Sequence, residues 1–138
     1  MRGEFNHTID AKGRLFFPAK LRDKLGDSFI VTKGIDGCLF VYSSAAWDEL
    51  EGRIAAMPMS KSRELQRFFF SSAADCEVDA QGRILIPQTL REHAGITREV
   101  TVIGVSGRAE IWDTARWNAY NNRIDESELI VAMEELGF

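Results

Sequence analysis

Two short cationic sequences contain the residues best suited to binding a partner. The first is Asp10-Ala-Lys-Gly-Arg14, and Asp79-Ala-Gln-Gly-Arg83 follows 69 residues later. Each predicts a tight turn, because an Asp side chain can bond the backbone two residues on and Gly accepts a positive φ. A guanidinium on such a turn can donate two parallel hydrogen bonds to guanine O6 and N7 in the major groove. The chemistry that these turns favour is recognition of a DNA duplex.

The first turn offers a different role for each of its polar residues. Arg14 is the predicted base-reading residue, since a good bidentate pair supplies about 1 to 3 kcal/mol of discrimination. Lys12 is a mobile point charge, which suits a phosphate contact that sets register. Gly13 lets the backbone approach DNA closely. Asp10 is expected to shape the turn only, because its carboxylate would repel phosphate.

The second turn carries the same pattern with less positive charge. Arg83 is the pseudo-symmetric DNA-binding candidate, with Gly82 and Gln81 beside it, and Asp79 is expected to shape this turn. Gln81 stands where the first turn has Lys, and residues 75–95 carry a net charge of −2. In these surroundings Arg83 could instead pair with a neighbouring carboxylate. We therefore expect Arg83 to contribute less to binding than Arg14.

Simpler interpretations exist for each of these residues taken alone. A single Asp-x-x-Gly-Arg sequence is more simply a hairpin turn whose Arg pairs with the turn Asp, but its duplication in one context favours a shared binding role. Lys20, Arg22 and Lys24 fall on a short predicted helix. A solvated charged face is the simpler interpretation for any one of them, so they are secondary candidates for contacts to the DNA backbone.

The turns belong to a longer internal repeat. Pro18 matches Pro87 and Gly26 matches Gly95 at the same offset of 69. After one inserted residue the offset becomes 70, and it then pairs Gly34, Gly37, Tyr42 and Trp47 with Gly104, Gly107, Trp112 and Trp117. A match of this length indicates a duplicated structural unit.

Each copy predicts the same series of elements around its turn. The strands that return from the turns, 15–17 and 84–86, are apolar at every position, which predicts cover on both faces. Pro18 and Pro87 suit the first position of a short helix, and Gly26 and Gly95 suit the position after its end. The remaining predictions are an alternating first strand (5–9), hairpins 29–32 with 38–42 and 100–103 with 109–112, closing helices that start near Ser44 and Asp113, and a linking helix over 61–73.

The predicted fold class is α+β and mainly β, with each copy reading ββαββ followed by a helix. One such module would bury too little surface alone. We therefore expect the copies to pair within the chain as an intertwined pseudo-two-fold β-barrel, with peripheral helices and both turns at its rim. The expected divisions are a first module (1–58), a linking helix (59–74), a second module (75–124) and an acidic C-terminal helix (125–138).

The net charge of −4 conceals a local basic region. Residues 113–138 account for −4, whereas residues 1–26 carry +3. The tail alternates acids with apolar residues at helical spacing, which suits a helix that docks on its own body or on a neighbour. The chain shows neither a membrane span nor a secretory signal, so we expect a soluble intracellular protein that acts without the membrane.

Other function classes find little support in the sequence. Cys38 and Cys76 lack a partner at metal-ligand spacing, which argues against a zinc site and a disulfide framework. His7 and His93 stand in unrelated contexts, so no catalytic residues are assigned and no enzyme is expected. No cofactor, metal or small-molecule substrate is expected either. The run Phe68–Phe70 suits packing in the core or a subunit interface better than stacking on single strands.

The repeated sequences Gly13-Arg-Leu-Phe-Phe-Pro18 and Gly82-Arg-Ile-Leu-Ile-Pro87 resemble the swapped-hairpin AbrB-type DNA-binding module. With Gly3–Ile9, Gly34–Cys38 and Arg67–Ser71, the chain resembles the MraZ family over nearly its whole length. Two departures are Ser72, where Gly is usual, and Gln81.

This resemblance implies a transcription regulator that binds short direct repeats upstream of the division and cell-wall gene cluster. It further implies repression, assembly into rings, and a cytoplasmic location on the nucleoid. The alternative is an AbrB-like protein-interaction or antitoxin-type module in which DNA binding is weak. The intact Lys12-Gly13-Arg14 sequence favours the DNA-binding interpretation.

Overall fold

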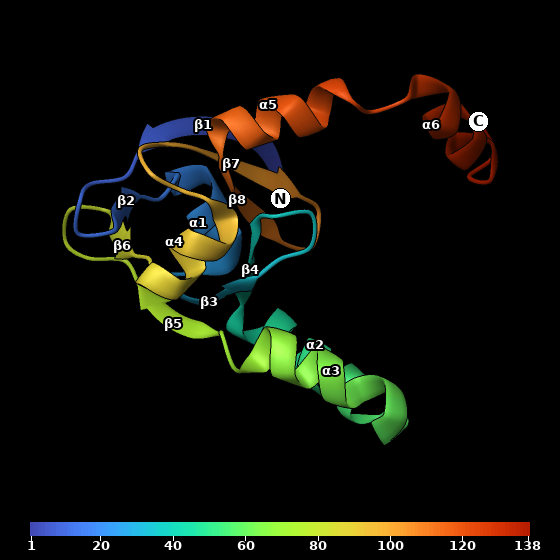
Figure 1. Cartoon of the computed structure of the whole chain (residues 1–138), viewed down its shortest axis with the longest axis horizontal. Coiled ribbons are helices and arrows are strands. Elements are labelled where there is room, and N and C mark those ends of the chain that lie inside the picture. The colour runs from blue at the N-terminus through green and yellow to red at the C-terminus, as the bar shows by residue number, and fades with distance from the viewer.

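The computed structural model describes all 138 residues, and the repeat appears in it as two equivalent sets of elements (Figure 1). The first copy comprises β1 (Arg2–Thr8), β2 (Arg14–Phe16), α1 (Ala19–Leu25), β3 (Ser28–Lys33), β4 (Leu39–Ser43) and α2 (Ser44–Ala55). The second comprises β5 (Ala74–Glu77), β6 (Arg83–Leu85), α4 (Gln88–Ala94), β7 (Glu99–Val105), β8 (Ala109–Asp113) and α5 (Thr114–Asn122). Helix α3 (Met59–Phe70) joins the copies, and α6 (Glu126–Glu134) follows the second.

The two copies exchange their first strands. Strand β1 pairs with β7 of the second copy, and β5 pairs with β3 of the first. The hairpins meet through β4 and β8, which gives one antiparallel sheet in the order β1-β7-β8-β4-β3-β5. The α+β class is therefore confirmed, with an antiparallel sheet, but the expectation of a mainly β protein is wrong, because the helices contain more residues than the strands.

The expected closed barrel is not found. The six-stranded sheet ends in two free edges, β1 and β5, and the short strands β2 and β6 form a separate two-stranded sheet. The expected hairpin between the first strand and β2 is present only as a short one: Ile9 and Leu15 form an antiparallel bridge, and the N–H of Asp10 donates to the carbonyl of Arg14. Beyond this bridge, β2 pairs along its whole length with its repeat equivalent, β6.

Strands β2 and β6 form what we call the ribbon, and the ribbon is covered on one face only. Leu15 and Ile84 are buried in the largest core cluster, whereas Phe16 and Leu85 are 51% and 58% exposed. The expectation of cover on both faces was therefore wrong. The short helices α1 and α4 reach the inner face alone, which leaves the outer side of the ribbon open.

The helices begin and end close to the predicted residues. Pro18 and Pro87 precede α1 and α4 rather than opening them, and Gly26 and Gly95 follow these helices with positive φ. The side chain of Ser43, not Ser44, caps α2 by accepting from the N–H of Ala46. Asp113 caps α5, and the linking helix α3 starts two residues earlier than predicted.

Two arms project from the body on the side away from the ribbon (Figure 1). One consists of α2 and α3; Phe69 stacks on Phe40 of β4 and anchors this arm to the sheet, while Phe70 packs against Trp47 of α2 within the arm. The other consists of α5 and α6, and every residue of α6 is exposed, so the tail does not dock on its own body. No helix is both long and apolar enough to cross a membrane.

Candidate nucleic-acid interface

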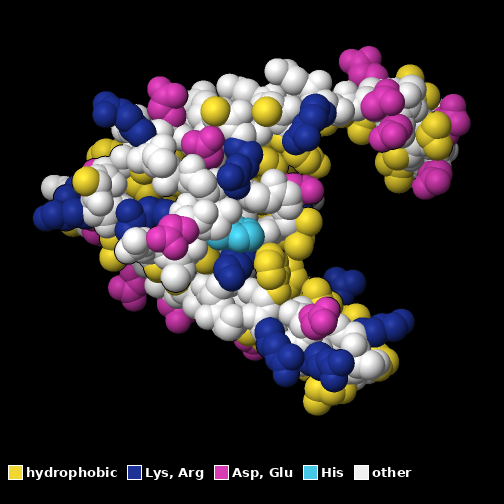
Figure 2. All heavy atoms as spheres, in the orientation of Figure 1, with side chains coloured by type: hydrophobic (Ala, Val, Ile, Leu, Met, Phe, Trp, Pro, Cys, Tyr) yellow, Lys and Arg dark blue, Asp and Glu magenta, His cyan; other side chains and the backbone are white.

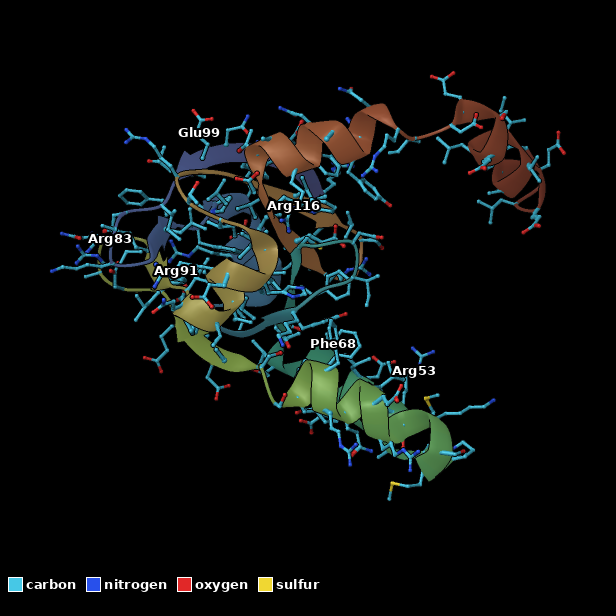
Figure 3. All side chains as sticks on the ribbon, in the orientation of Figure 1. Arg53, Phe68, Arg83, Arg91, Glu99 and Arg116 are labelled. Carbon is cyan, nitrogen blue, oxygen red and sulfur yellow. The ribbon has the colours of Figure 1, made fainter.

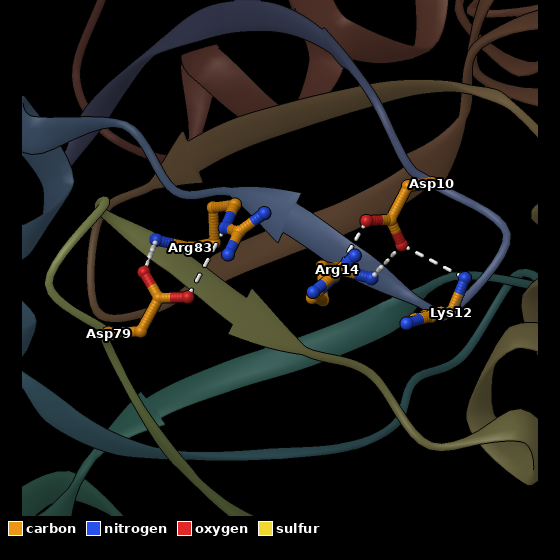
Figure 4. Close-up of polar contacts among 5 residues, drawn as sticks. All are labelled: Asp10, Lys12, Arg14, Asp79 and Arg83. Atoms are coloured by element: carbon orange, nitrogen blue, oxygen red, sulfur yellow. Dashed lines mark hydrogen bonds and ion pairs between the residues drawn. The ribbon is translucent and has the colours of Figure 1, made fainter.

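Each turn is built around its aspartate (Figure 4). Asp10 Oδ1 accepts from the backbone N–H groups of Lys12 (3.0 Å) and Arg14 (2.9 Å), and Oδ2 accepts from Arg14 Nε at 2.7 Å. The N–H of Gly13, which has a φ of +87°, donates to the carbonyl of Asp10. The hydrogen bond from the Arg14 backbone, with that from its side chain, holds the pKa of Asp10 below its usual value. Asp10 therefore stays ionised at neutral pH and keeps these contacts.

The second turn repeats this geometry. Asp79 Oδ1 accepts from the N–H groups of Gln81 and Arg83, both at 2.9 Å, and Oδ2 accepts from Arg83 Nε at 3.2 Å. Gly82 has a φ of +80°. The backbone hydrogen bond from Arg83 is the main cause that lowers the pKa of Asp79. The two turns are therefore close structural copies.

The ion pairs within the turns leave part of each guanidinium free. Only Nε of Arg14 and of Arg83 is bound to the turn aspartate, and no ion pair engages their Nη atoms. The pairing fixes the arginine stem while the two terminal nitrogens keep their donors for a partner. Pairing with the turn Asp and availability for binding therefore coexist.

The outer face of the ribbon alternates cationic and apolar side chains. Arg14 lies opposite Leu85, and Phe16 lies opposite Arg83, in the antiparallel register of β2 and β6. A major groove about 12 Å wide admits a two-stranded ribbon, and it offers guanine acceptors and thymine methyl groups to such a face. Sequence reasoning missed Phe16 and Leu85. The sequence carries no signal for their exposure, because residues 15–17 and 84–86 are apolar at every position.

The secondary candidates do not join the turns as a group. Lys20 and Lys24 line a separate hollow with Arg2 and the chain terminus, and no residue of the ribbon belongs to it. Arg22 lies beside Gly82, but its Nη2 is paired with Asp27 at 3.0 Å. Of these three cations, only Arg22 is near a turn.

Two further arginines reach the first turn from the second copy. Arg91 donates from Nε to the carbonyl of Ile86 (3.0 Å), and its side chain would lie 3.0 Å from a Cβ at position 13, which explains why Gly13 is needed. Figure 3 shows Arg83 and Arg91 at the same end of the body, far from Arg53 on the α2–α3 arm. Arg98 lines a hollow of about 360 Å³ together with Arg14, Arg83 and Phe16.

The fold and this face define a duplicated α+β protein whose copies exchange strands and present a cationic two-stranded ribbon. The chain belongs to the MraZ family: the family model described as "MraZ protein, putative antitoxin-like" matches residues 1–67 and again 69–136. The family expected from the sequence is thus confirmed.

Close relatives agree over nearly the full length. The chain is 51% identical to the transcriptional regulator MraZ of Heliobacterium modesticaldum, over 99% of this chain and 96% of the relative. It is 49% identical to that of Thermoanaerobacter pseudethanolicus, over 99% and 98%, and 52% identical to that of Desulforamulus reducens, over 91% and 89%. The family is one of transcriptional regulators rather than of enzymes.

Proposed function

We propose that the chain is a sequence-specific regulator of transcription that binds double-stranded DNA through the outer face of the ribbon. The observation that carries this proposal is the free guanidinium ends of Arg14 and Arg83, fixed at their Nε atoms beside the exposed Phe16 and Leu85. Arg14 and Arg83 read bases, Gly82 allows close approach, and Lys12 and Gln81 contact the backbone. Gly13, the equivalent of Gly82, is buried against Ile86 and Arg91 and serves the turn instead. Such a face supplies both positioning and base contacts.

The regulatory role follows from the family rather than from the geometry. We propose binding to direct repeats upstream of the division and cell-wall gene cluster, with repression as the outcome, in the cytoplasm and on the nucleoid. The cross-copy pairing of β1 and β5 supports a swapped-hairpin arrangement of two modules, 1–58 and 75–124, joined by 59–74 and followed by the helical tail 125–138.

Assembly into a ring-like homo-oligomer completes the proposal. Helix α6 and its flanks carry five acids and leave Leu129, Ile130 and Leu136 about half exposed or more. Helix α3 of the other arm carries one exposed acid, Glu64, and three exposed cations, Lys61, Arg63 and Arg67 (Figure 2). We propose that α6 docks on α3 of the next copy, because the charges are complementary and apolar surface of this extent favours burial.

Salt dependence of duplex binding tests the proposed function. A ribbon that neutralises several phosphates should lose affinity steeply with salt, with a slope of log K against log[salt] of about −0.9 per phosphate contacted. We expect this for a duplex taken from upstream of the chain's own gene, measured by fluorescence anisotropy between about 50 and 200 mM salt. Absence of duplex binding at the lowest salt would contradict the proposal and favour the protein-interaction alternative.

A further inference from the structure

We infer that the two ends of the ribbon are unequal toward DNA. Arg98 adds a phosphate contact beside the first turn, Asp27 repels phosphate beside the second turn, and the chain therefore binds each copy of its proposed DNA repeat, which we call the element, in one direction. This inference rests on the proposed function and deepens it. It makes Arg98 and Asp27, which no motif contains, the residues that set orientation.

The strand exchange places Arg98 and Asp27 at equivalent positions. The N–H of Ile9, just before the first turn, donates to the carbonyl of Arg98 at 2.8 Å. The N–H of Val78, just before the second turn, donates to the carbonyl of Asp27 at 2.9 Å. The repeat in the sequence does not pair these residues, because Ile96 and Thr97 lengthen the loop after α4. Only the fold shows that a cation at one end corresponds to an anion at the other.

The environments of the two residues reinforce this difference. Arg98 is exposed and has no ion-pair partner, and it lines a hollow with Arg14 and Arg83, whose charges are offset by Asp10 and Asp79. At the other end the Asp27 side chain is 79% exposed and takes the guanidinium of Arg22 as its partner. A phosphate would meet the uncompensated charge of Arg98 beside the first turn and the carboxylate of Asp27 beside the second.

The arginines behind the turns differ in the same sense. Arg91 and Arg22 are repeat equivalents, and each lies beside the glycine of a turn, Gly13 or Gly82. Arg91 donates to a neutral carbonyl and keeps its charge, whereas the charge of Arg22 is offset by Asp27. The second end is therefore less positive both at its surface and at the arginine that lies behind its turn.

Further pairs of equivalent positions mostly agree. Lys12 corresponds to Gln81, and Thr8 corresponds to Glu77, so that in both pairs the first end is the more positive. Glu99, which corresponds to Ser28, runs the other way. The balance still favours the first end, because the exchange of Arg98 for Asp27 alone changes the charge by two units.

Unequal ends have a consequence for orientation. If the two ends of the ribbon were identical, a rotation of 180° about the pseudo-two-fold axis would leave the ribbon unchanged. Such a ribbon would bind an element equally well in both directions. Reversal of this ribbon brings Asp27 to the phosphates that Arg98 would contact, and like charges placed together at an interface disfavour that arrangement. The chain should therefore bind every element in the same orientation, with its Arg14 end always at the same flank.

Affinity and salt dependence test the role of Arg98. On a duplex with a single element, Arg98→Gln should weaken binding several-fold and reduce the slope of log K against log[salt] by about 0.9. Lys24→Gln is the matched control, because Lys24 is exposed but lines the separate hollow. Equal effects of the two substitutions would overturn the assignment of Arg98.

Directed cleavage of DNA tests the orientation. An iron–EDTA reagent attached to Ala11→Cys should cut one flank of a single element, and the same reagent on Ala80→Cys should cut the other. Both alanines are exposed, while Cys38 and Cys76 are buried with raised thiol pKa values and will not compete. In a chain that also carries Asp27→Arg and Gln81→Lys, each reagent should cut both flanks. Cutting of both flanks by the unmodified ribbon would overturn the inference, whereas failure to bind the duplex at all would overturn the proposed function and this inference with it.

Discussion

Arg14→Ala should weaken specific duplex binding by about tenfold to a hundredfold per module, the loss expected for one bidentate contact worth about 1 to 3 kcal/mol. The Nη atoms of Arg14 carry the free donors, and no other residue of the first turn can replace a planar fork. The fold should survive, because the backbone N–H groups of residues 12 and 14 still donate to Asp10. Anisotropy titrations on the duplex from upstream of the chain's own gene, paired with thermal melting of the protein, measure both effects.

Two matched variants sharpen this prediction. Arg14→Lys keeps the charge without the fork, so it should preserve the salt slope and lose discrimination between the element and a scrambled duplex. Arg83→Ala should cost less than Arg14→Ala, because Asp27 already weakens phosphate contact at that end and the Arg83 side chain is only 24% exposed. Equal losses for the two alanine variants would show that the ends of the ribbon are equivalent after all.

Three copies of the element on one duplex should bind about 10² to 10⁴ times more tightly than one copy, because the subunits of the proposed ring would act as linked modules. The groove returns to the same side only about every 10 base pairs, so half a helical turn inserted between copies should abolish the gain. Insertion of a full turn is the control and should restore part of it. The measurement is a titration of the chain against this set of duplexes at one salt concentration.

Substitutions in α6 test the same prediction from the protein rather than from the DNA. Replacing the exposed Leu129 and Met133 by serine should dissociate the ring and remove the multi-copy gain while leaving affinity for one copy unchanged, since neither residue lies near the ribbon. Light scattering reports the assembly. Equal affinity for one copy and three, insensitive to spacing, would mean that each chain binds alone.

Local structure in this chain was predictable because it is local. Asp10 and Gly13 fix a turn through bonds that span four residues or fewer, and Gly26 ends a helix through its own φ. The repeat then doubled every such signal. These features need no knowledge of which strand pairs with which.

The sequence could not predict which strands of the two copies pair with each other, and the reason is physical. A strand of three residues such as β2 carries too little pattern to specify its neighbour, and the pairing of β1 with β7 depends on the whole sheet. The residues that reach the first turn from the second copy, Arg91 and Arg98, follow from that pairing alone. The exposure of Phe16 has the same origin, because the open outer face exists only when β2 pairs with β6.

Photocrosslinking from the ribbon tests most directly whether its outer face touches DNA. A benzophenone amino acid replaces Phe16 in one sample and Ile35 in another, which is a matched pair because both side chains are 51% exposed while Ile35 lies in the distant turn between β3 and β4. Irradiation with the duplex from upstream of the chain's own gene should give a covalent protein–DNA adduct from position 16 and none from position 35. Adducts from position 35 without any from position 16 would contradict the proposed interface.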